Sequence, residues 1–140
     1  LTYNSHSVAC AAALAVLNIY ENEQLNSNAE RMGFYTDTCM KKLIDKYPCI
    51  GDWRNIGMSG CLELVKNRDT KEPMAPFNAT PSEMSIINKV VGERRVLGMF
   101  NYTRWNYIFV APPLIANEEE IEKGMDIISK ALLIADEYCY

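Results

Sequence analysis

The 140-residue sequence predicts an α+β fold, a small antiparallel sheet with helices packed mainly on one face. Two stretches, Ile50–Val65 and Met99–Ala111, are rich in β-branched and aromatic residues, which predicts short strands. Four other stretches carry helix start or stop signals around apolar residues in helical spacing. The length is that of one domain.

The first helix is expected from about Ser5 to Glu21. Val8–Leu17 is small and apolar with a run of alanines, and alanine is the best helix former. Small residues on several faces let another backbone approach, so we predict that this helix is buried. The preceding polar segment, Thr2–Ser7, would place free N–H groups where an anion such as phosphate could bind. The alternative is an ordinary helix start at a chain end.

A second helix is expected after the polar break at residues 22–24 and ends near Lys46, before Pro48. Ser27 and Glu30 have the spacing of a capping box, and the alternative is a helix start about one turn earlier. Its apolar positions approximate one stripe, formed by Leu25, Ala29, Met32, Cys39, Met40, Leu43 and Ile44. Ile50–Val65 then predicts either two short strands or one bent strand, with glycines at bends or bulges.

The second half of the chain begins with a charged and proline-rich loop, Lys66–Ala79. Thr80 with Glu83 three residues later predicts a helix start, and Gly98 the corresponding stop. Its buried side is expected to hold Met84, Ile87, Val91 and Leu97.

Two strands with a turn near Arg104–Asn106 are expected next, within Met99–Ala111. Asn117 with Glu120 predicts the start of a last helix. The buried face of this helix is expected to hold Ile121, Met125, Ile128, Leu132 and Ala135.

Charge and cysteine content exclude several classes of function. The net charge of −4, with no basic block, argues against nucleic acid or an anionic membrane as a partner. No apolar run approaches the roughly 20 residues of a membrane span. Five cysteines with no metal-type spacing predict no metal site and suit a reducing, cytoplasmic compartment: Cys10, Cys39, Cys49, Cys61 and Cys139.

Several blocks, in this order along nearly the whole chain, resemble class III pyridoxal-phosphate (PLP) aminotransferases of fold type I. These blocks are Thr2–Leu14, Gly51–Met58, Glu63–Lys66 with Thr70–Pro73, and Ala111–Leu114. The segment Arg104–Pro113 looks most like the taurine–pyruvate aminotransferase branch of this family. The resemblance implies that residues 1–140 are the C-terminal small domain of a longer polypeptide.

The resemblance assigns roles to two residues. Thr2 is expected to reach the phosphate of the PLP held by the neighbouring subunit, so that a homodimer shares its sites. Arg104 is expected to bind the carboxylate of an amino acceptor such as pyruvate, since a guanidinium pairs bidentately with a carboxylate. Its spacing to Pro112 is shorter than in many relatives, and the alternative is a structural arginine. Arg54, which also matches a family block, is interpreted as structural.

No catalytic residue is expected within the chain. PLP chemistry needs a lysine bonded to the cofactor and a carboxylate near its pyridine nitrogen. The family places both upstream of Thr2, and all eight lysines here lie in polar helix faces or charged loops. The only histidine, His6, has no sequence-evident partner and is interpreted as a helix-start residue that hydrogen-bonds the backbone.

Three functions remain open from the sequence. The first is an aminotransferase that moves an amino group from an ω-amino donor, such as taurine or β-alanine, to a keto acid. The second is an aminomutase on the same scaffold. The third is a stand-alone interaction module without enzymatic activity. The fragment alone is expected to be inactive.

Overall fold

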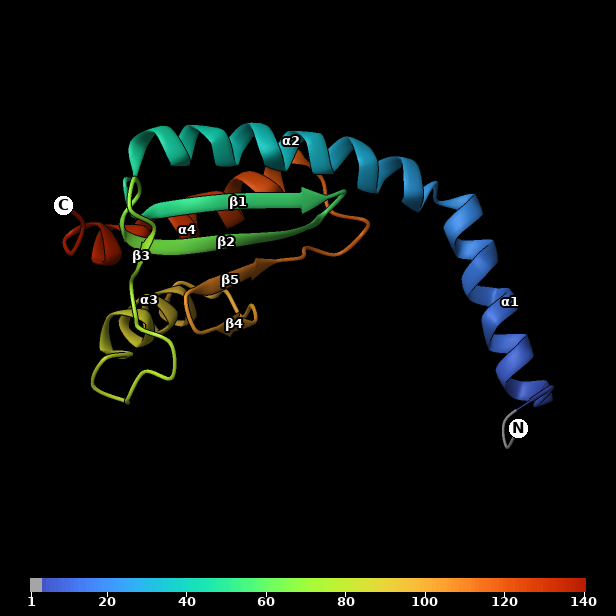
Figure 1. Ribbon diagram of the computed structural model, residues 1–140. Helices are drawn as coiled ribbons and strands as arrows, with labels where there is room; N and C mark the ends of the chain where they lie inside the picture. The colour runs from blue at the N-terminus through green and yellow to red at the C-terminus, as the bar shows by residue number, and fades with distance from the viewer. Residues whose placement is uncertain (1–3) are drawn as a thin grey trace.

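The computed structural model describes residues 4–140, which form four helices and five strands (Figure 1). In chain order these are α1 (Ser7–Asn22), α2 (Leu25–Lys46), β1 (Ile50–Ile56), β2 (Ser59–Asn67), β3 (Glu72–Pro73), α3 (Ser85–Val96), β4 (Thr103–Arg104), β5 (Tyr107–Val110) and α4 (Glu118–Asp136). No helix within these residues is both long and apolar enough to cross a membrane.

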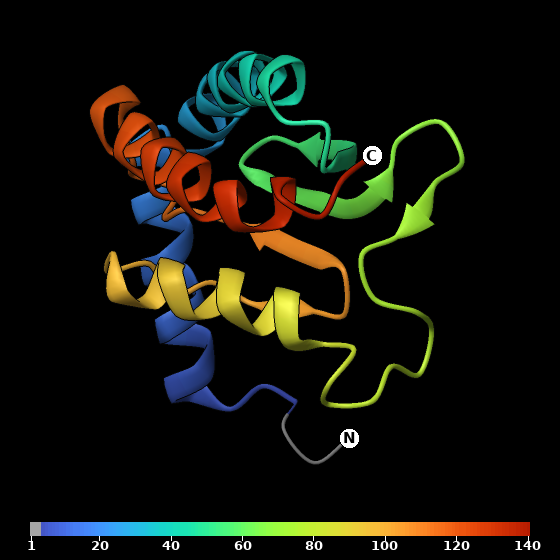
Figure 2. The same ribbon diagram turned by 90° about the vertical axis from the view of Figure 1, so that its left-hand side faces the viewer.

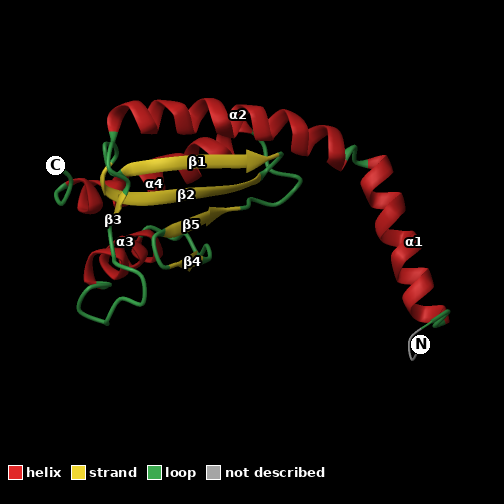
Figure 3. Cartoon of the chain, in the orientation of Figure 1, coloured by secondary structure: helices red, strands yellow, loops and turns green. Residues whose placement is uncertain are grey.

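The sheet is antiparallel, with strand order β1-β2-β5-β4, and the short β3 pairs with β2. Helices α2, α4 and α3 lie side by side on one face of it, with α4 in the middle (Figures 2 and 3). The α+β fold with helices on one face is therefore confirmed. Of the two possibilities for Ile50–Val65, the structure shows two strands, joined at the tight turn Gly57–Met58.

Side chains of β2 alternate between the two faces of the sheet. Leu62 and Leu64 are buried beneath the helices, whereas Cys61 and Glu63 are only partly buried on the opposite face. On β5, Ile108 is buried beside Leu62, its register partner. A period of two is what an antiparallel sheet with one covered face requires.

Helices α2 and α4 bury most of the apolar positions that the sequence predicts, whereas α3 buries only Ile87 of its four predicted positions and buries Val90 and Arg94 in addition. Met32, Met40 and Leu43 of α2 are buried, and the spacing also buries Gly33 and Thr36. Helix α4 buries all five predicted positions together with Ala131, namely Ile121, Met125, Ile128, Leu132 and Ala135. Its predicted capping box is present, because the Asn117 side chain accepts from the Glu120 N–H at 3.0 Å and the Asn117 N–H donates to Glu120 at 3.0 Å.

Two predicted helix starts differ from the structure. Helix α2 begins at Leu25, with Gln24 in the left-handed region (φ 52°) as the preceding residue, so the Ser27–Glu30 capping box is wrong. Thr80 and Glu83 do bond reciprocally, but they close a turn, and α3 begins at Ser85. Gly98 ends α3 with φ 90°, as expected.

The predicted burial of the first helix is wrong for the described chain. None of the residues of α1 is buried, and the helix points away from the sheet (Figure 1). Five large apolar side chains are between 47% and 69% exposed, namely Val8, Leu14, Val16, Leu17 and Ile19. Burial requires a partner surface, and residues 4–140 do not supply one.

Helix α2 and the β1–β2 turn approach each other closely at two glycines. A Cβ added to Gly33 would lie 2.5 Å from the backbone of Gly57, which has φ 53°. Asn55 fastens the two segments, because its Nδ2 donates to the carbonyl oxygens of Gly33 (3.1 Å) and Gly57 (3.0 Å). The turn can lie this close to α2 only because Gly33, as a glycine, has no side chain.

Gly33→Ala should destabilise the protein even though alanine is the better helix former. The added methyl meets backbone rather than a movable side chain, and such overpacking costs about 1–3 kcal/mol. Gly92→Ala in α3 is the matched control, because a Cβ there meets no heavy atom within 4 Å. This variant should gain about 0.5–1 kcal/mol. Thermal or urea unfolding measures both, and equal effects of the two substitutions would contradict the packing described.

Candidate functional site

The face of the sheet opposite the helices carries a row of polar side chains. Arg104 pairs with Tyr107 in register, Tyr107 with Glu63, and Glu63 with Asp52, so the row crosses β4, β5, β2 and β1. Because register partners point to the same face, all four side chains lie on the side away from α2, α3 and α4. This row is the basis of the candidate site.

Arg104, the predicted carboxylate-binding residue, is exposed at the end of β4. No carboxylate of residues 4–140 forms an ion pair with it, whereas Arg54 on the same face is paired with Asp52 at 2.8 Å. The Arg54–Asp52 pair is itself largely exposed, so it contributes little to stability. Of the two arginines, Arg104 is thus the one whose guanidinium remains available to a ligand.

The turn that follows Arg104 is anchored to the segment Ala75–Pro76. Trp105 has φ 54°, and its indole N–H donates to the carbonyl oxygens of Ala75 (2.7 Å) and Pro76 (2.8 Å). Asn106 is fully buried, where it accepts from the Ala75 N–H at 2.8 Å and donates to the Ala75 carbonyl at 2.9 Å. Both polar ends of a buried amide are thereby satisfied, and the backbone beside Arg104 is held in place.

Aromatic rings surround this turn. Trp105 makes edge contacts with Phe77 and Tyr107, at centroid distances of 5.9 and 5.7 Å. Desolvation, reinforced by the Glu63 carboxylate, raises the pKa of Tyr107, so the phenol remains protonated at neutral pH. An arginine beside aromatic rings suits a small ligand that has an anionic group and an apolar part.

Arg94, which the sequence reading did not single out, supports the other side of β4. Its side chain on α3 is buried and donates to Asn101 Oδ1 and, at 2.5 Å, to Thr103 Oγ1. Burial, aided by Arg95, lowers its pKa to about 10, which leaves it cationic at neutral pH. Arg94 shares a helix face with the buried Ile87 and Val90, because it follows them by seven and four residues. This spacing is the feature of the sequence from which the burial of Arg94 could have been predicted.

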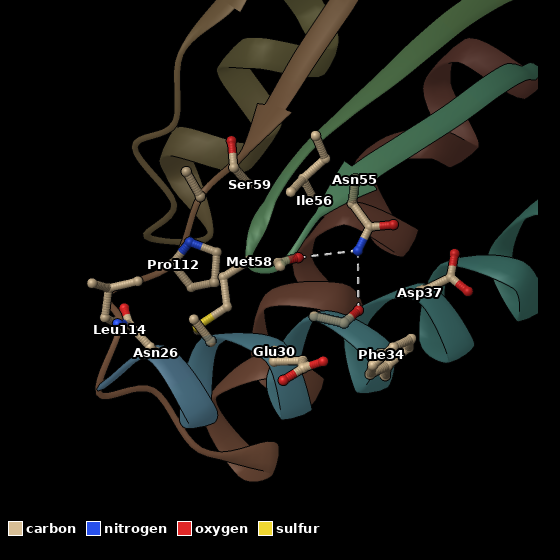
Figure 4. Close-up of a pocket in the computed structure, with 14 residues that line it drawn as sticks. Asn26, Glu30, Phe34, Asp37, Asn55, Ile56, Met58, Ser59, Pro112 and Leu114 are labelled. Carbon is tan, nitrogen blue, oxygen red and sulfur yellow. Dashed lines mark hydrogen bonds between the residues drawn. The ribbon is translucent and has the colours of Figure 1, made fainter. Parts of the chain in front are cut away.

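A concave surface lies at the other end of β5, between α2 and the β1–β2 turn (Figure 4). This open cleft has a volume of about 750 Å³ and includes Glu30, Asp37 and the exposed Phe34 and Ile56. No lysine or arginine lines it. An acidic cleft without a cation does not suit a phosphate or a carboxylate, so Arg104 and its neighbours are the better candidate for binding anions.

The lysines of the chain do not fit the role of a covalent PLP anchor. Seven of the eight are exposed, and Lys66, which is partly buried, lies 3.4 Å from Glu72. A lysine becomes a nucleophile at neutral pH when desolvation or a neighbouring cation lowers its pKa. The seven exposed lysines are not desolvated, and a side-chain hydrogen bond to Glu119 raises the pKa of Lys123.

Of the two remaining residues singled out in the sequence, the structure describes His6 only. Thr2 lies outside the described residues, so its predicted phosphate contact stays a prediction. His6 precedes α1 as expected, but its side chain makes no capping hydrogen bond, and it is the His6 carbonyl that accepts from the Cys10 N–H.

Comparison with known proteins identifies the family. The family model described as Aminotransferase class-III matches residues 1–132. The chain belongs to the class-III aminotransferases. It is 33% identical over 136 residues to an uncharacterized aminotransferase of Schizosaccharomyces pombe, with 94% of this chain and 29% of the relative covered. A leucine/methionine racemase of Thermococcus litoralis is 31% identical over 137 residues, with 97% of this chain and 29% of the relative covered.

Solved class-III structures contain the same fold. The taurine:2-oxoglutarate aminotransferase of Bifidobacterium kashiwanohense, in complex with PLP and glutamate, matches with a TM-score of 0.85 and 29% identity. The match covers 96% of this chain and 30% of that structure. The chain therefore spans about a third or less of the length of the relatives it matches.

Proposed function

We propose that residues 1–140 are the C-terminal small domain of a PLP-dependent aminotransferase. The proposed reaction moves an amino group from an ω-amino donor, such as taurine or β-alanine, to a keto acid such as pyruvate. Family membership over residues 1–132 and the 29% share of the relatives' length support the domain assignment. When bound, PLP would supply the electron sink on which amino-group transfer depends.

The observation that carries the substrate assignment is the guanidinium of Arg104, which forms no ion pair with any carboxylate of residues 4–140. It stands on the open sheet face, next to an anchored turn and aromatic rings. A charge-assisted, bidentate pair with the carboxylate of a keto acid would fix the orientation of that substrate. The buried Asn106 and Arg94 would hold the strand ends so that the guanidinium needs little reordering on binding.

The remaining parts of the proposal come from the family. The covalent lysine and most of the PLP contacts would lie outside residues 1–140, in agreement with the exposed lysines of this chain. Thr2 would complete the phosphate site of a neighbouring subunit in a homodimer, with no nucleic acid or membrane as partner. The solved taurine:2-oxoglutarate enzyme supports a taurine-like donor and a keto-acid acceptor for this protein.

An isomerisation within one substrate, as in an aminomutase, is the second candidate. One family relative is named as a leucine/methionine racemase, and a racemase, like an aminomutase, converts a single substrate without an amino acceptor. The two candidates differ in their need for a second substrate. An aminotransferase must consume a keto acid for each amine converted, whereas an isomerase turns over with one substrate alone.

Arg104→Ala in the intact protein should raise KM for the keto acid far more than for an alkylamine donor that has no carboxylate. The loss of a charge-assisted pair should cost about 2–4 kcal/mol in kcat/KM for the acceptor. Separate measurement of the two half-reactions tests this. Arg104→Lys should restore only part of the activity, because an ammonium lacks the bidentate geometry.

Arg95→Ala is the matched control for Arg104. Arg95 is exposed on α3, forms no ion pair within residues 4–140 and should leave both half-reactions unchanged. Equal losses in both half-reactions of Arg104→Ala, with folding intact, would assign Arg104 a structural role and remove the main support for the substrate assignment.

Thr2→Ala should weaken PLP binding by the intact protein. A hydrogen bond to a phosphate is charge-assisted, so its loss should cost about 1.5–3 kcal/mol. Titration of the apo-protein with PLP measures the change, and Thr70→Ala, in the exposed loop before β3, serves as control. Unchanged affinity in Thr2→Ala would reject the assignment of Thr2.

A further inference from the structure

Two cysteines and one aspartate meet at the end of the sheet opposite the β1–β2 turn. Cys49 lies directly before β1, while Asp136 ends α4 and Cys139 lies three residues beyond it. The thiol sulfurs and a carboxylate oxygen all lie within 4.8 Å of one another. Asp136 and Cys139 lie 87 and 90 positions after Cys49 in the chain, and the fold brings the three residues together. The spacing of the cysteines along the sequence therefore did not reveal the cluster.

The fold holds the three groups from several sides. Cys49 is fully buried, and its N–H donates to Asp136 Oδ1 at 3.4 Å. The Cys139 thiol donates to the Val65 carbonyl at 3.3 Å, on the strand that pairs with β1. Next in the chain, the Tyr140 N–H donates to the Lys66 carbonyl at 3.1 Å, so the segment after α4 is fastened to β2.

The chemistry of the cluster is that of a ligand set rather than of apolar packing. Asp136 forms no ion pair with any lysine or arginine in the part of the chain described, although its side chain is only partly exposed. Cysteine sulfur and carboxylate oxygen are both ligand types that zinc takes in proteins.

We propose that Cys49, Asp136 and Cys139 bind one thiophilic divalent cation, with zinc as the reference ion. Tetrahedral zinc with ligand distances of about 2.0–2.3 Å places its ligand atoms roughly 3.5–3.8 Å apart. Side-chain rotations that shorten the distances between the two sulfurs and the carboxylate oxygen by up to about 1 Å would therefore bring these atoms to the separations that zinc requires. A water molecule would take the fourth position.

Binding requires both thiols to ionise. Each S–H bond breaks as a sulfur–zinc bond forms, and about two protons per zinc pass to the buffer. Two thiolates and one carboxylate around Zn²⁺ give a net charge of −1 at the site. No oxidant or reductant takes part.

The site would be structural and independent of the proposed amino-group transfer. It lies at the start of β1 and the end of α4, whereas Arg104 lies on β4, at the opposite edge of the sheet (Figure 1). Bound zinc would link the segment after α4 to the start of β1, at the edge of the sheet. A ligand that binds only the folded state raises its stability.

The test is zinc retention by the reduced, purified protein after dialysis against ZnCl₂ and then against metal-free buffer. We expect one zinc per chain, release of about two protons per zinc and a higher unfolding temperature than that of the metal-free protein. Cys139→Ser and Asp136→Asn keep the side-chain shapes and should each lose the retained zinc. Cys61→Ser, at a partly buried thiol on the open sheet face, is the matched control and should retain it.

Several results would contradict the proposed zinc site. Absence of retained zinc in the wild-type protein would overturn the proposal, as would retention that survives Cys139→Ser. Proton release near zero would place the zinc on other groups. Formation of a Cys49–Cys139 disulfide by a protein that retains no zinc when reduced would make the pair a redox site instead.

Discussion

One-sided burial of the antiparallel sheet is the constraint on which the rest of the structure depends. Leu62 and Leu64 on β2 must meet the helices, and the period of two then turns Cys61 and Glu63 to the other face. Since β5 and β4 continue the same register, Arg104 is directed to the open face by the same alternation. A slip of one residue would reverse both faces at once.

Local signals in the sequence predicted much of this fold. The Asn117–Glu120 box, Gly98 and the apolar spacing in α4 are short-range features, and each appears in the structure as expected. Burial was predictable only where the partner surface lies within the chain. The apolar face of α1 has no such surface among residues 4–140, so its alanine-rich composition predicted a burial that the structure does not show.

The candidate site was predicted in outline only. Sequence resemblance named Arg104, but the side chains that support it bond to residues in other segments: Asn106 bonds to Ala75, 31 residues away, and Arg94 bonds to Thr103, nine residues away. Hydrogen bonds of this kind have no periodic signature. The same holds for Cys49, Asp136 and Cys139, whose proximity is produced by packing of α4 against the sheet.

We propose that residues 1–140 contribute a substrate-recognising face, whereas the lysine that would bond to PLP lies outside them. The most direct test is to load the intact protein with PLP, reduce it with borohydride so that any cofactor–lysine bond becomes permanent, and map the labelled peptide. The account predicts one label on a lysine outside residues 1–140, with all eight lysines of this chain unlabelled. A stoichiometric label on any of these eight would contradict it.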